Sequence, residues 1–251
     1  MSDNDGEFGK KLALAIAQGL NVVVVHGGGP QINAALKEAG IESQFVGGFR
    51  VTTPETFAVV ERVLSEEVGP QVAETLTQSG VAALAISGRH SGTLFAQKQK
   101  HLVNGDLADL GLVGEVRRVD TAAIEVLLEK NITPVISPIA NEIESEDGLN
   151  VNADIAAAAV SGALKAEELI IMTDVAGIYR NWPDQDSLID AISAAELETI
   201  KNTFAEGMAP KVQACLDAIK AGAIAVRIID GKDPEAFASA LAHNGGTLVV
   251  A

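Results

Sequence analysis

A glycine run lies where the backbone could approach an anion. His26-Gly27-Gly28-Gly29-Pro30 follows the β-branched run 21–25 and precedes a helical pattern. Without Cβ atoms, Gly28 and Gly29 can bring backbone N–H groups close to a charged ligand, and the N-terminus of the next helix adds a favourable dipole. A tight strand-to-helix turn without a ligand explains the same run equally well. The run therefore indicates either an anion site or a plain turn.

Arg50 is a second candidate, because it follows the flexible pair Gly47-Gly48. A guanidinium group can bind a carboxylate through two parallel hydrogen bonds. Most single arginines are merely solvated, so this motif alone favours a surface role.

Asn150, Asn152 and Asp154 lie where a polar hairpin gives way to an Ala-rich helical pattern. Asn152 and Asp154 could cap that helix and complement its dipole. Alternatively, the two amides could hold a substrate while the carboxylate positions a lysine. The residue types leave both interpretations open.

A loop after the strongest apolar strand is a candidate nucleotide site. In open α/β sheets, ligands bind beyond the carboxyl ends of the strands. The loop residues that we expect near a nucleotide are Asp174, Val175, Gly177, Ile178 and Tyr179. An Asp/Gly turn without a ligand is the alternative.

The segment Gly207-Met208-Ala209-Pro210-Lys211 enters a helix. Pro210 fits the first helical position, which places Lys211 in the first turn, where its charge opposes the helix dipole. A lysine in that position favours a functional role beside an anion, although exposed lysines commonly have none.

The composition excludes several function classes. A net charge of -16 leaves few basic residues to neutralise phosphates, so no nucleic-acid partner is expected. The single cysteine, Cys215, cannot form an internal disulfide, and the sequence has no Cys/His cluster of the metal-binding type. The acidic N-terminus is unlike a signal peptide, and no apolar run could span a bilayer. We therefore expect a cytoplasmic protein without a membrane partner.

Two periodicities alternate along the 251 residues. Short β-branched runs predict buried parallel strands at 21–25, 81–86, 133–136, 169–172, 225–229 and 247–250. Helical patterns cover 8–20, 31–39, 121–129, 153–164, 194–202, 210–221 and 234–242, and a long helix begins at Thr53-Pro54. Polar segments at 92–98, 114–119 and 141–150 predict projecting β-ribbons. The alternation predicts an α/β fold with a mostly parallel, doubly wound sheet.

Taken in order, these motifs resemble those of the N-acetylglutamate kinases in the amino-acid kinase family. The similar segments are His26–Ile32, Arg50-Val51-Thr52, Asp109–Val116, Asn150–Asp154, Thr173–Tyr179, Gly207–Lys211 and Gly246-Thr247. The resemblance implies a single amino-acid kinase domain over 1–251, a three-layer αβα sandwich with a mostly parallel central sheet and projecting β-ribbons. Within it, the lobe of about 1–148 would bind the acid and the lobe of about 149–251 would bind ATP.

The resemblance also implies a reaction and a role for each candidate. ATP, with Mg²⁺ carried on its phosphates and no metal ligand from the protein, phosphorylates the side-chain carboxylate of N-acetyl-L-glutamate in arginine biosynthesis. Lys211 would stabilise the transition state, and Asp154 would organise the catalytic lysines. The implied substrate ligands are Gly28, Gly29, Arg50, Asn150 and Asn152, and the implied nucleotide ligands are Asp174, Val175, Gly177, Ile178, Tyr179, Gly207 and Met208. A homodimer is the implied assembly.

The sequence departs from the family pattern at four places. No strand with a Lys-x-Gly-Gly motif precedes Asp3, Gly69-Pro70 replaces Asn-Lys, Arg89-His90-Ser91 replaces a Lys/Asp/Gly stretch, and His243-Asn244-Gly245 differs from the arginine-binding tail. The first departure leaves two interpretations, an enzyme whose natural start lies upstream or a non-catalytic relative that binds the amino acid. A kinase of an acetylated or carrier-linked aminoadipate is a third alternative, because the motifs are shared.

Overall fold

A computed structural model describes residues 6–102, 106–204 and 208–251. Its contacts divide the chain into two compact units, one formed by Asn21–Ala156 and one by Ala157–Ala251 together with the chain up to Leu20. The predicted site residue Gly207 lies outside the described residues. In that described part, no helix combines the length and the apolarity needed to cross a membrane.

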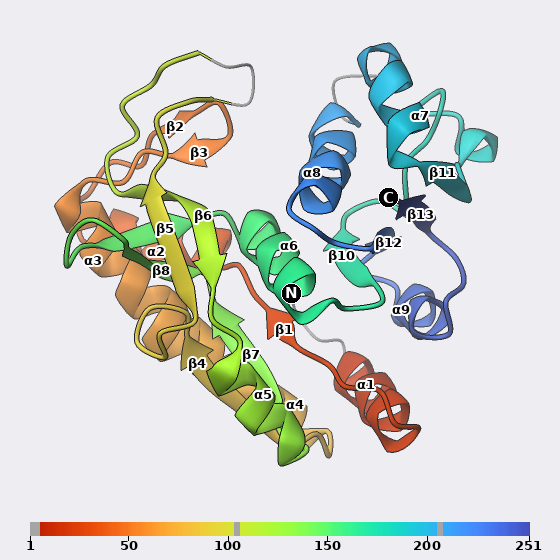
Figure 1. The fold of residues 1–251 in the computed structure, drawn as a ribbon, viewed down its shortest axis with the longest axis horizontal. Coiled ribbons are helices and arrows are strands. Elements are labelled where there is room, and N and C mark those ends of the chain that lie inside the picture. The colour runs from red at the N-terminus through yellow and green to blue at the C-terminus, as the bar shows by residue number, and fades with distance from the viewer. Residues whose placement is uncertain (1–5, 103–105, 205–207) are drawn as a thin grey trace. The chain divides into compact units, whose positions relative to one another are not determined.

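The Asn21–Ala156 unit contains a three-stranded sheet in the order β1-β7-β4 (Figure 1). Both pairings are parallel, and all of β7 is buried, as is typical of a central parallel strand. Only Val24 and Val25 of the predicted strand 21–25 belong to β1, which lies at one end of this sheet. The bounds are β1 Val24–Val25, β4 Ala83–Ser87 and β7 Thr133–Ser137.

The helix predicted from Thr53-Pro54 contains a π-helical segment in its middle. Thr53 Oγ1 accepts a hydrogen bond from the Thr56 N–H at 3.2 Å, which caps the first turn. Pro70 has no N–H to donate to the carbonyl four residues earlier, which favours the wider π turn. The helices of this unit are α2 Gly29–Glu38, α3 Pro54–Arg62, the π-helix η1 Val63–Val68, α4 Gly69–Gln78 and α5 Ala122–Glu129.

The segments predicted to be projecting β-ribbons pair into a closed four-stranded barrel, in the order β5-β6-β9-β8. Closure leaves these strands without an open edge. A separate hairpin, β2 with β3, was not predicted. Its two-residue turn needs positive φ at both positions, which Gly47 (56°) and Gly48 (86°) supply. The bounds are β2 Phe45–Val46, β3 Phe49–Arg50, β5 Leu94–Lys98, β6 Val113–Val119, β8 Ile139–Glu142 and β9 Gly148–Val151.

The second unit contains a four-stranded sheet in the order β10-β12-β13-β11. β10 and β12 are parallel, as are β11 and β13, whereas β12 and β13 are antiparallel. The positions of the three strands predicted here are confirmed, but the expected parallel direction of 247–250 is wrong with respect to β12, and β11 is an addition. The bounds are β10 Leu169–Thr173, β11 Ala191–Ser193, β12 Ala225–Asp230 and β13 Thr247–Val250.

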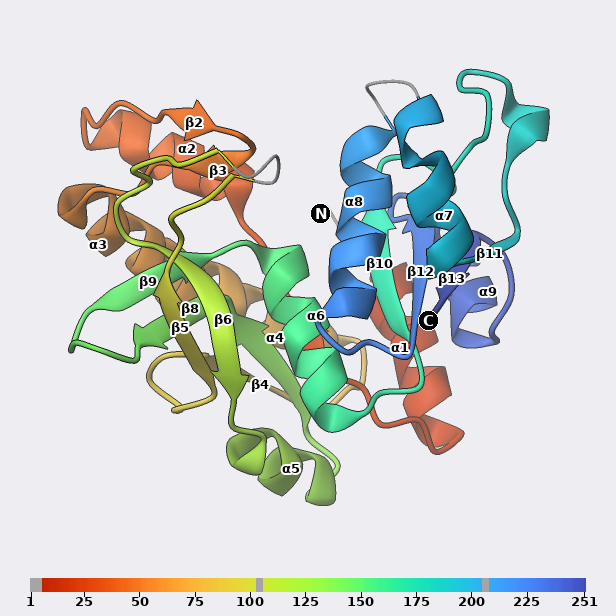
Figure 2. The same ribbon diagram turned by 45° about the horizontal axis from the view of Figure 1, so that its top comes forward.

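Helices lie on both sides of this sheet, with α7 and α8 on one side and α1 on the other (Figure 2). The Phe8 and Phe237 rings lie 4.3 Å apart, and Lys11 Nζ lies 2.7 Å from Glu235 Oε1. These contacts join α1 to α9, so the first helix groups with the C-terminal unit rather than with the N-terminal lobe. The bounds are α1 Glu7–Ala17, α6 Ala153–Leu164, η2 Gln185–Ser187, α7 Ala194–Ile200, η3 Lys201–Thr203, α8 Ala209–Lys220 and α9 Pro234–Leu241.

Candidate active site

The glycine run forms the turn between β1 and α2. Gly28 is the N-cap residue of α2, and Gly29 is the first residue of the helix. A Cβ on Gly28 would lie 2.7 Å from Leu64 Cδ2, so any larger residue there would have to displace the Leu64 side chain. A Cβ on Gly29 would meet nothing within 4 Å. The Cβ side of Gly29 is therefore open, whereas the Cβ side of Gly28 packs against Leu64.

The start of α6 lies beside this turn, since a Cβ on Gly27 would lie 3.6 Å from Ala153 Cβ. Asn152 Oδ1 accepts hydrogen bonds from the N–H groups of Asp154 (2.8 Å) and Ile155 (3.2 Å). The helix-cap interpretation of Asn152 is thus confirmed, and its amide NH₂ is the part left for a ligand. Asp154 is exposed in the first turn, yet desolvation by the surrounding protein raises the pKa of its carboxyl.

Arg50 is buried, with 8% of its surface exposed, which contradicts the interpretation as a solvated residue. Its Nη1 donates to Ser43 Oγ, and its Nη2 donates to Asn33 Oδ1 at 2.7 Å. The guanidinium carbon lies 4.6 Å from the centre of the Phe45 ring. Burial lowers the pKa of Arg50. All three partners are uncharged, so they orient the guanidinium without neutralising its charge. A carboxylate ligand would neutralise it.

Thr52 connects three of the predicted motifs. Its Oγ1 donates to the Arg50 carbonyl at 2.8 Å and accepts from Asn150 Nδ2 at 3.2 Å. Its carbonyl accepts from the Leu112 N–H at 2.7 Å. A Cβ on Gly111, which has φ +69°, would lie 2.3 Å from that carbonyl oxygen. Thr52 therefore holds Arg50 and Asn150 in one hydrogen-bonded framework, and this framework requires glycine at position 111.

Lys211 lies in the first turn of α8 and forms an ion pair. Its Nζ lies 3.0 Å from Asp174 Oδ1, and its side chain is 19% exposed against 66% for that of Asp174. The hydrogen bond from Lys211 holds the pKa of the Asp174 carboxyl below its usual range. The sequence pointed to an external anion beside Lys211, and the structure places a carboxylate of the same chain there.

The rest of the predicted nucleotide loop is anchored in the core of the second unit. Ile178, Tyr179 and Met208 are each less than a tenth exposed and belong to one apolar cluster. The Ile178 N–H donates to Thr247 Oγ1 at 2.8 Å, and a Cβ on Gly177 would lie 2.5 Å from the same oxygen. These residues shape the loop from inside, so a ligand would reach the Asp174–Ala176 part of it.

Sequence reasoning missed Asn33, Ser43 and Lys232. Asn33 orients Arg50 from α2, which no local pattern connects to it, whereas Ser43 precedes the strand that pairs with Arg50 across the Gly47-Gly48 turn. The charge of Lys232 also lowers the pKa of Asp174. A signal for Lys232 was available, because it follows β12, the parallel neighbour of the strand that precedes Asp174.

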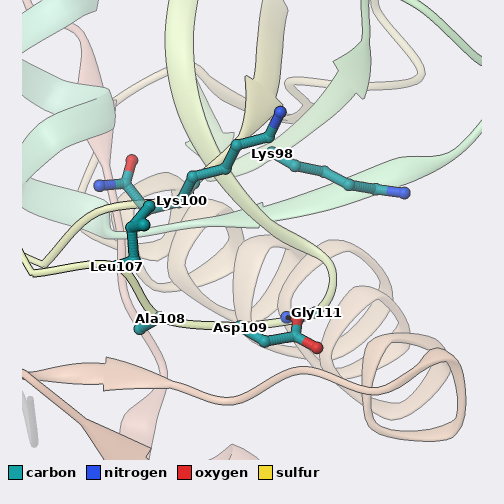
Figure 3. Close-up of a pocket in the computed structure, with 7 residues that line it drawn as sticks. Lys98, Lys100, Leu107, Ala108, Asp109 and Gly111 are labelled. Atoms are coloured by element: carbon teal, nitrogen blue, oxygen red, sulfur yellow. Dashed lines mark hydrogen bonds between the residues drawn. The ribbon is translucent and has the colours of Figure 1, made fainter.

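A pocket of about 380 Å³ in the first unit includes Gly111, whose backbone lies against Thr52. Lys98 lies 3.5 Å from Asp147 Oδ2 and 3.9 Å from Glu142 Oε2, so carboxylates of the protein already balance its charge. Figure 3 shows the Lys98 and Lys100 side chains extending away from the chain around Asp109. The pocket is lined by Lys98, Gln99, Lys100, Leu107, Ala108, Asp109 and Gly111, none of them a predicted site residue.

The site residues thus form two clusters, each within one unit. The arginine cluster (Gly28, Gly29, Arg50 and Asn150) offers backbone N–H groups and a buried cation to an acid. The lysine cluster (Asp174, Val175 and Lys211) lies beyond the carboxyl end of a parallel strand, where nucleotides bind. Cations and N–H groups that converge on charged oxygens are what phosphoryl transfer requires.

Comparison with known proteins identifies the class. The profile of the amino acid kinase family matches residues 2–230, and the chain belongs to that family. An acetylglutamate kinase of Streptomyces coelicolor is 43% identical over 92% of this chain and 76% of its own length. An acetylglutamate kinase of Paenarthrobacter aurescens is 47% identical over 87% of this chain and 72% of its own.

A solved structure supports the fold. The N-acetylglutamate synthase of Neisseria gonorrhoeae, complexed with coenzyme A and N-acetyl-glutamate, superposes with a TM-score of 0.80 at 22% identity. The match covers 98% of this chain and 55% of the synthase chain. At that identity the likeness concerns the fold alone.

Proposed function

We propose that the protein transfers the γ-phosphoryl group of ATP to the side-chain carboxylate of N-acetyl-L-glutamate, giving N-acetyl-L-glutamyl 5-phosphate in arginine biosynthesis. The relatives at 43% and 47% identity support the reaction. The observation that carries the substrate class is Arg50, a buried cation whose named partners are all uncharged. Such a site favours an anionic ligand, because an unbalanced buried charge is costly.

In this proposal the arginine cluster binds the acid. The free edge of the Arg50 guanidinium binds one carboxylate of the substrate, and Asn150 binds its amino-acid part. The N–H groups of Gly28 and Gly29, at the N-terminus of α2, face the oxygens on which negative charge develops. Asn152 adds its amide NH₂, and Asp154 orders the cations around the transferring group.

The lysine cluster binds ATP in this proposal. The Asp174–Ala176 part of the loop contacts the nucleotide, and Ile178, Tyr179 and Met208 support that loop from the core. Mg²⁺ would come bound to the phosphates. Lys211 exchanges Asp174 for a phosphate oxygen when ATP binds. An acid oxygen then forms a bond to the γ-phosphorus while the bond to the β-phosphate oxygen breaks, and ADP leaves. Lys211 stabilises the negative charge on the phosphoryl group while that group moves from ADP to the acid.

A hydroxylamine trap tests the proposal, because an acyl phosphate gives a coloured hydroxamate that depends on both ATP and the acid. We expect product with N-acetyl-L-glutamate and much less with N-acetyl-L-aspartate, whose shorter side chain misplaces the carboxylate. A preference for an acetylated aminoadipate would instead support the aminoadipate kinase that the sequence left open. Binding of N-acetyl-L-glutamate without any turnover would support a non-catalytic relative instead.

A further inference from the structure

His26 is buried between the glycine turn and the π-helical segment. It is 8% exposed, and its Nδ1 lies 3.0 Å from the carbonyl oxygen of Gly27. A carbonyl only accepts hydrogen bonds, so Nδ1 carries the proton and Nε2 is a bare acceptor. Nε2 is itself buried and has no hydrogen-bond partner within the described parts of the chain. Buried polar atoms without a partner are rare, and each one needs a reason.

The π-helical segment closes on the ring from the other side. The Gly69 N–H donates to the Leu64 carbonyl, a bond that spans five residues and is typical of a π turn. A Cβ on Gly69 would lie 3.2 Å from His26 Nε2. A Cβ on Gly28 would lie 2.7 Å from Leu64 Cδ2 and 3.4 Å from Val68 Cγ2. The turn from Leu64 to Gly69 therefore lies against both the Nε2 edge of His26 and the Cβ side of Gly28.

The hydrogen bond to Gly27 controls the direction of a neighbouring N–H. The Gly27 carbonyl and the Gly28 N–H belong to one planar trans peptide, so they point in opposite directions. With glycine on both sides, that peptide could otherwise rotate at little cost. A hydrogen bond that fixes the direction of the Gly27 carbonyl therefore also fixes the direction of the Gly28 N–H.

We propose that His26 is a positioning residue. Its Nδ1–H holds the Gly27–Gly28 peptide in one orientation and so presents the Gly28 N–H to the ligand, and the π-helical segment Val63–Val68 supports the imidazole ring. The inference rests on the proposed function in one respect, that the ligand is the acid or the transferring phosphoryl group. Burial also lowers the pKa of His26, which keeps the ring neutral and its Nε2 bare.

A matched pair of substitutions tests this role. The amide nitrogen of His26→Asn can replace Nδ1, whereas that of His26→Gln reaches the position of Nε2. We expect His26→Asn to retain the slow amide exchange of a peptide covering residues 22–32 and to bind N-acetyl-L-glutamate within about threefold of the parent. His26→Gln should exchange faster there and bind roughly tenfold more weakly, the order of one lost hydrogen bond.

Other readouts separate positioning from simple packing and from the proposed function. Nitrogen NMR of the parent should show a protonated Nδ1 and a bare Nε2 on His26, and the opposite tautomer would overturn the inference. Equal exchange and equal binding in the two variants would overturn it as well. A parent that fails to bind N-acetyl-L-glutamate would refute the substrate, while the exchange data would still decide whether His26 holds the turn.

Discussion

At the scale of single residues, Arg50 shows how a cation becomes specific for a carboxylate. Asn33 and Ser43 hold its two terminal nitrogens, and the Phe45 ring supports the guanidinium plane. We expect Arg50→Lys to raise the KM for N-acetyl-L-glutamate about tenfold or more and to leave the KM for ATP nearly unchanged, because lysine keeps the charge but loses the fork. Steady-state kinetics with each substrate varied in turn measure both constants. An unchanged KM for the acid would remove Arg50 from the substrate site.

Lys211 is the other residue whose role can be isolated. It faces charge that develops only as the phosphoryl group moves, so Lys211→Ala should lower kcat by roughly a hundredfold while the KM values change much less. Its partner Asp174 is 66% exposed, so the free energy of unfolding should change little. Lys220→Ala, at the other end of α8, is the control and should keep full kcat. A Lys211→Ala variant within a few fold of the parent kcat would remove Lys211 from the proposed catalytic residues.

The sequence was informative about which residues matter and less so about their partners. Glycine runs and caps are local signals, so the turn at Gly28 and the cap at Asn152 could be predicted. The burial of Arg50 could not, because Asn33 meets Arg50 only in the folded chain, although Ser43 and Phe45 lie just across the Gly47-Gly48 turn from it. The ion pair of Lys211 with Asp174 joins residues 37 positions apart for the same reason (211 minus 174).

At the scale of elements, Gly111 shows how one backbone contact fixes a strand connection. A Cβ there would lie 2.3 Å from the Thr52 carbonyl oxygen, and φ is +69°. Gly92 is a natural control, with φ +66° and nothing within 4 Å of a Cβ. Gly92→Ala should cost about 1 kcal/mol of unfolding free energy, the cost of a left-handed alanine alone. Gly111→Ala should cost about 2 kcal/mol more and also raise the KM for the acid, because Thr52 holds Asn150.

Urea unfolding measures the stability of these two alanine variants, and steady-state kinetics with varied N-acetyl-L-glutamate measure their KM for the acid. Equal destabilisation would mean that the Gly111 backbone shifts freely and that the contact with Thr52 does not position the site.

Elements with a strong local period were predicted, and elements set by distant pairing were not. The helices of 153–164 and 234–241 follow from their composition and caps, whereas the closed barrel joins β5 to β8 and β6 to β9 across long stretches of chain. The π-helical segment had one local signal, the proline at position 70, but its width depends on packing against the glycine turn.

At the scale of the molecule, both units have an apolar core, and the second also contains a buried ion pair. Arg227 on β12 donates to Glu168 Oε1 at 2.6 Å and Oε2 at 3.2 Å, and to the Gly245 carbonyl at 2.6 Å. The side chains of Arg227 and Glu168 are 4% and 10% exposed. The pair therefore joins the entrance of β10, the middle of β12 and the turn before β13, three places whose proximity defines this sheet.

Breaking such a pair from one side leaves an unbalanced charge in a dry site, which costs about 3–5 kcal/mol. Arg227→Met should therefore lower the melting temperature by about 10 °C for a chain of this size. Replacing both partners, Arg227→Met with Glu168→Met, removes the charges together and should recover most of the loss, because well-packed apolar side chains can substitute for a buried pair.

Lys10→Met breaks an exposed pair with Glu7 and should change the melting temperature by a degree or two. Calorimetry of the four proteins, parent included, measures these differences. A double variant no more stable than Arg227→Met would show that the guanidinium stabilises the sheet through the Gly245 carbonyl and its own packing rather than through its charge.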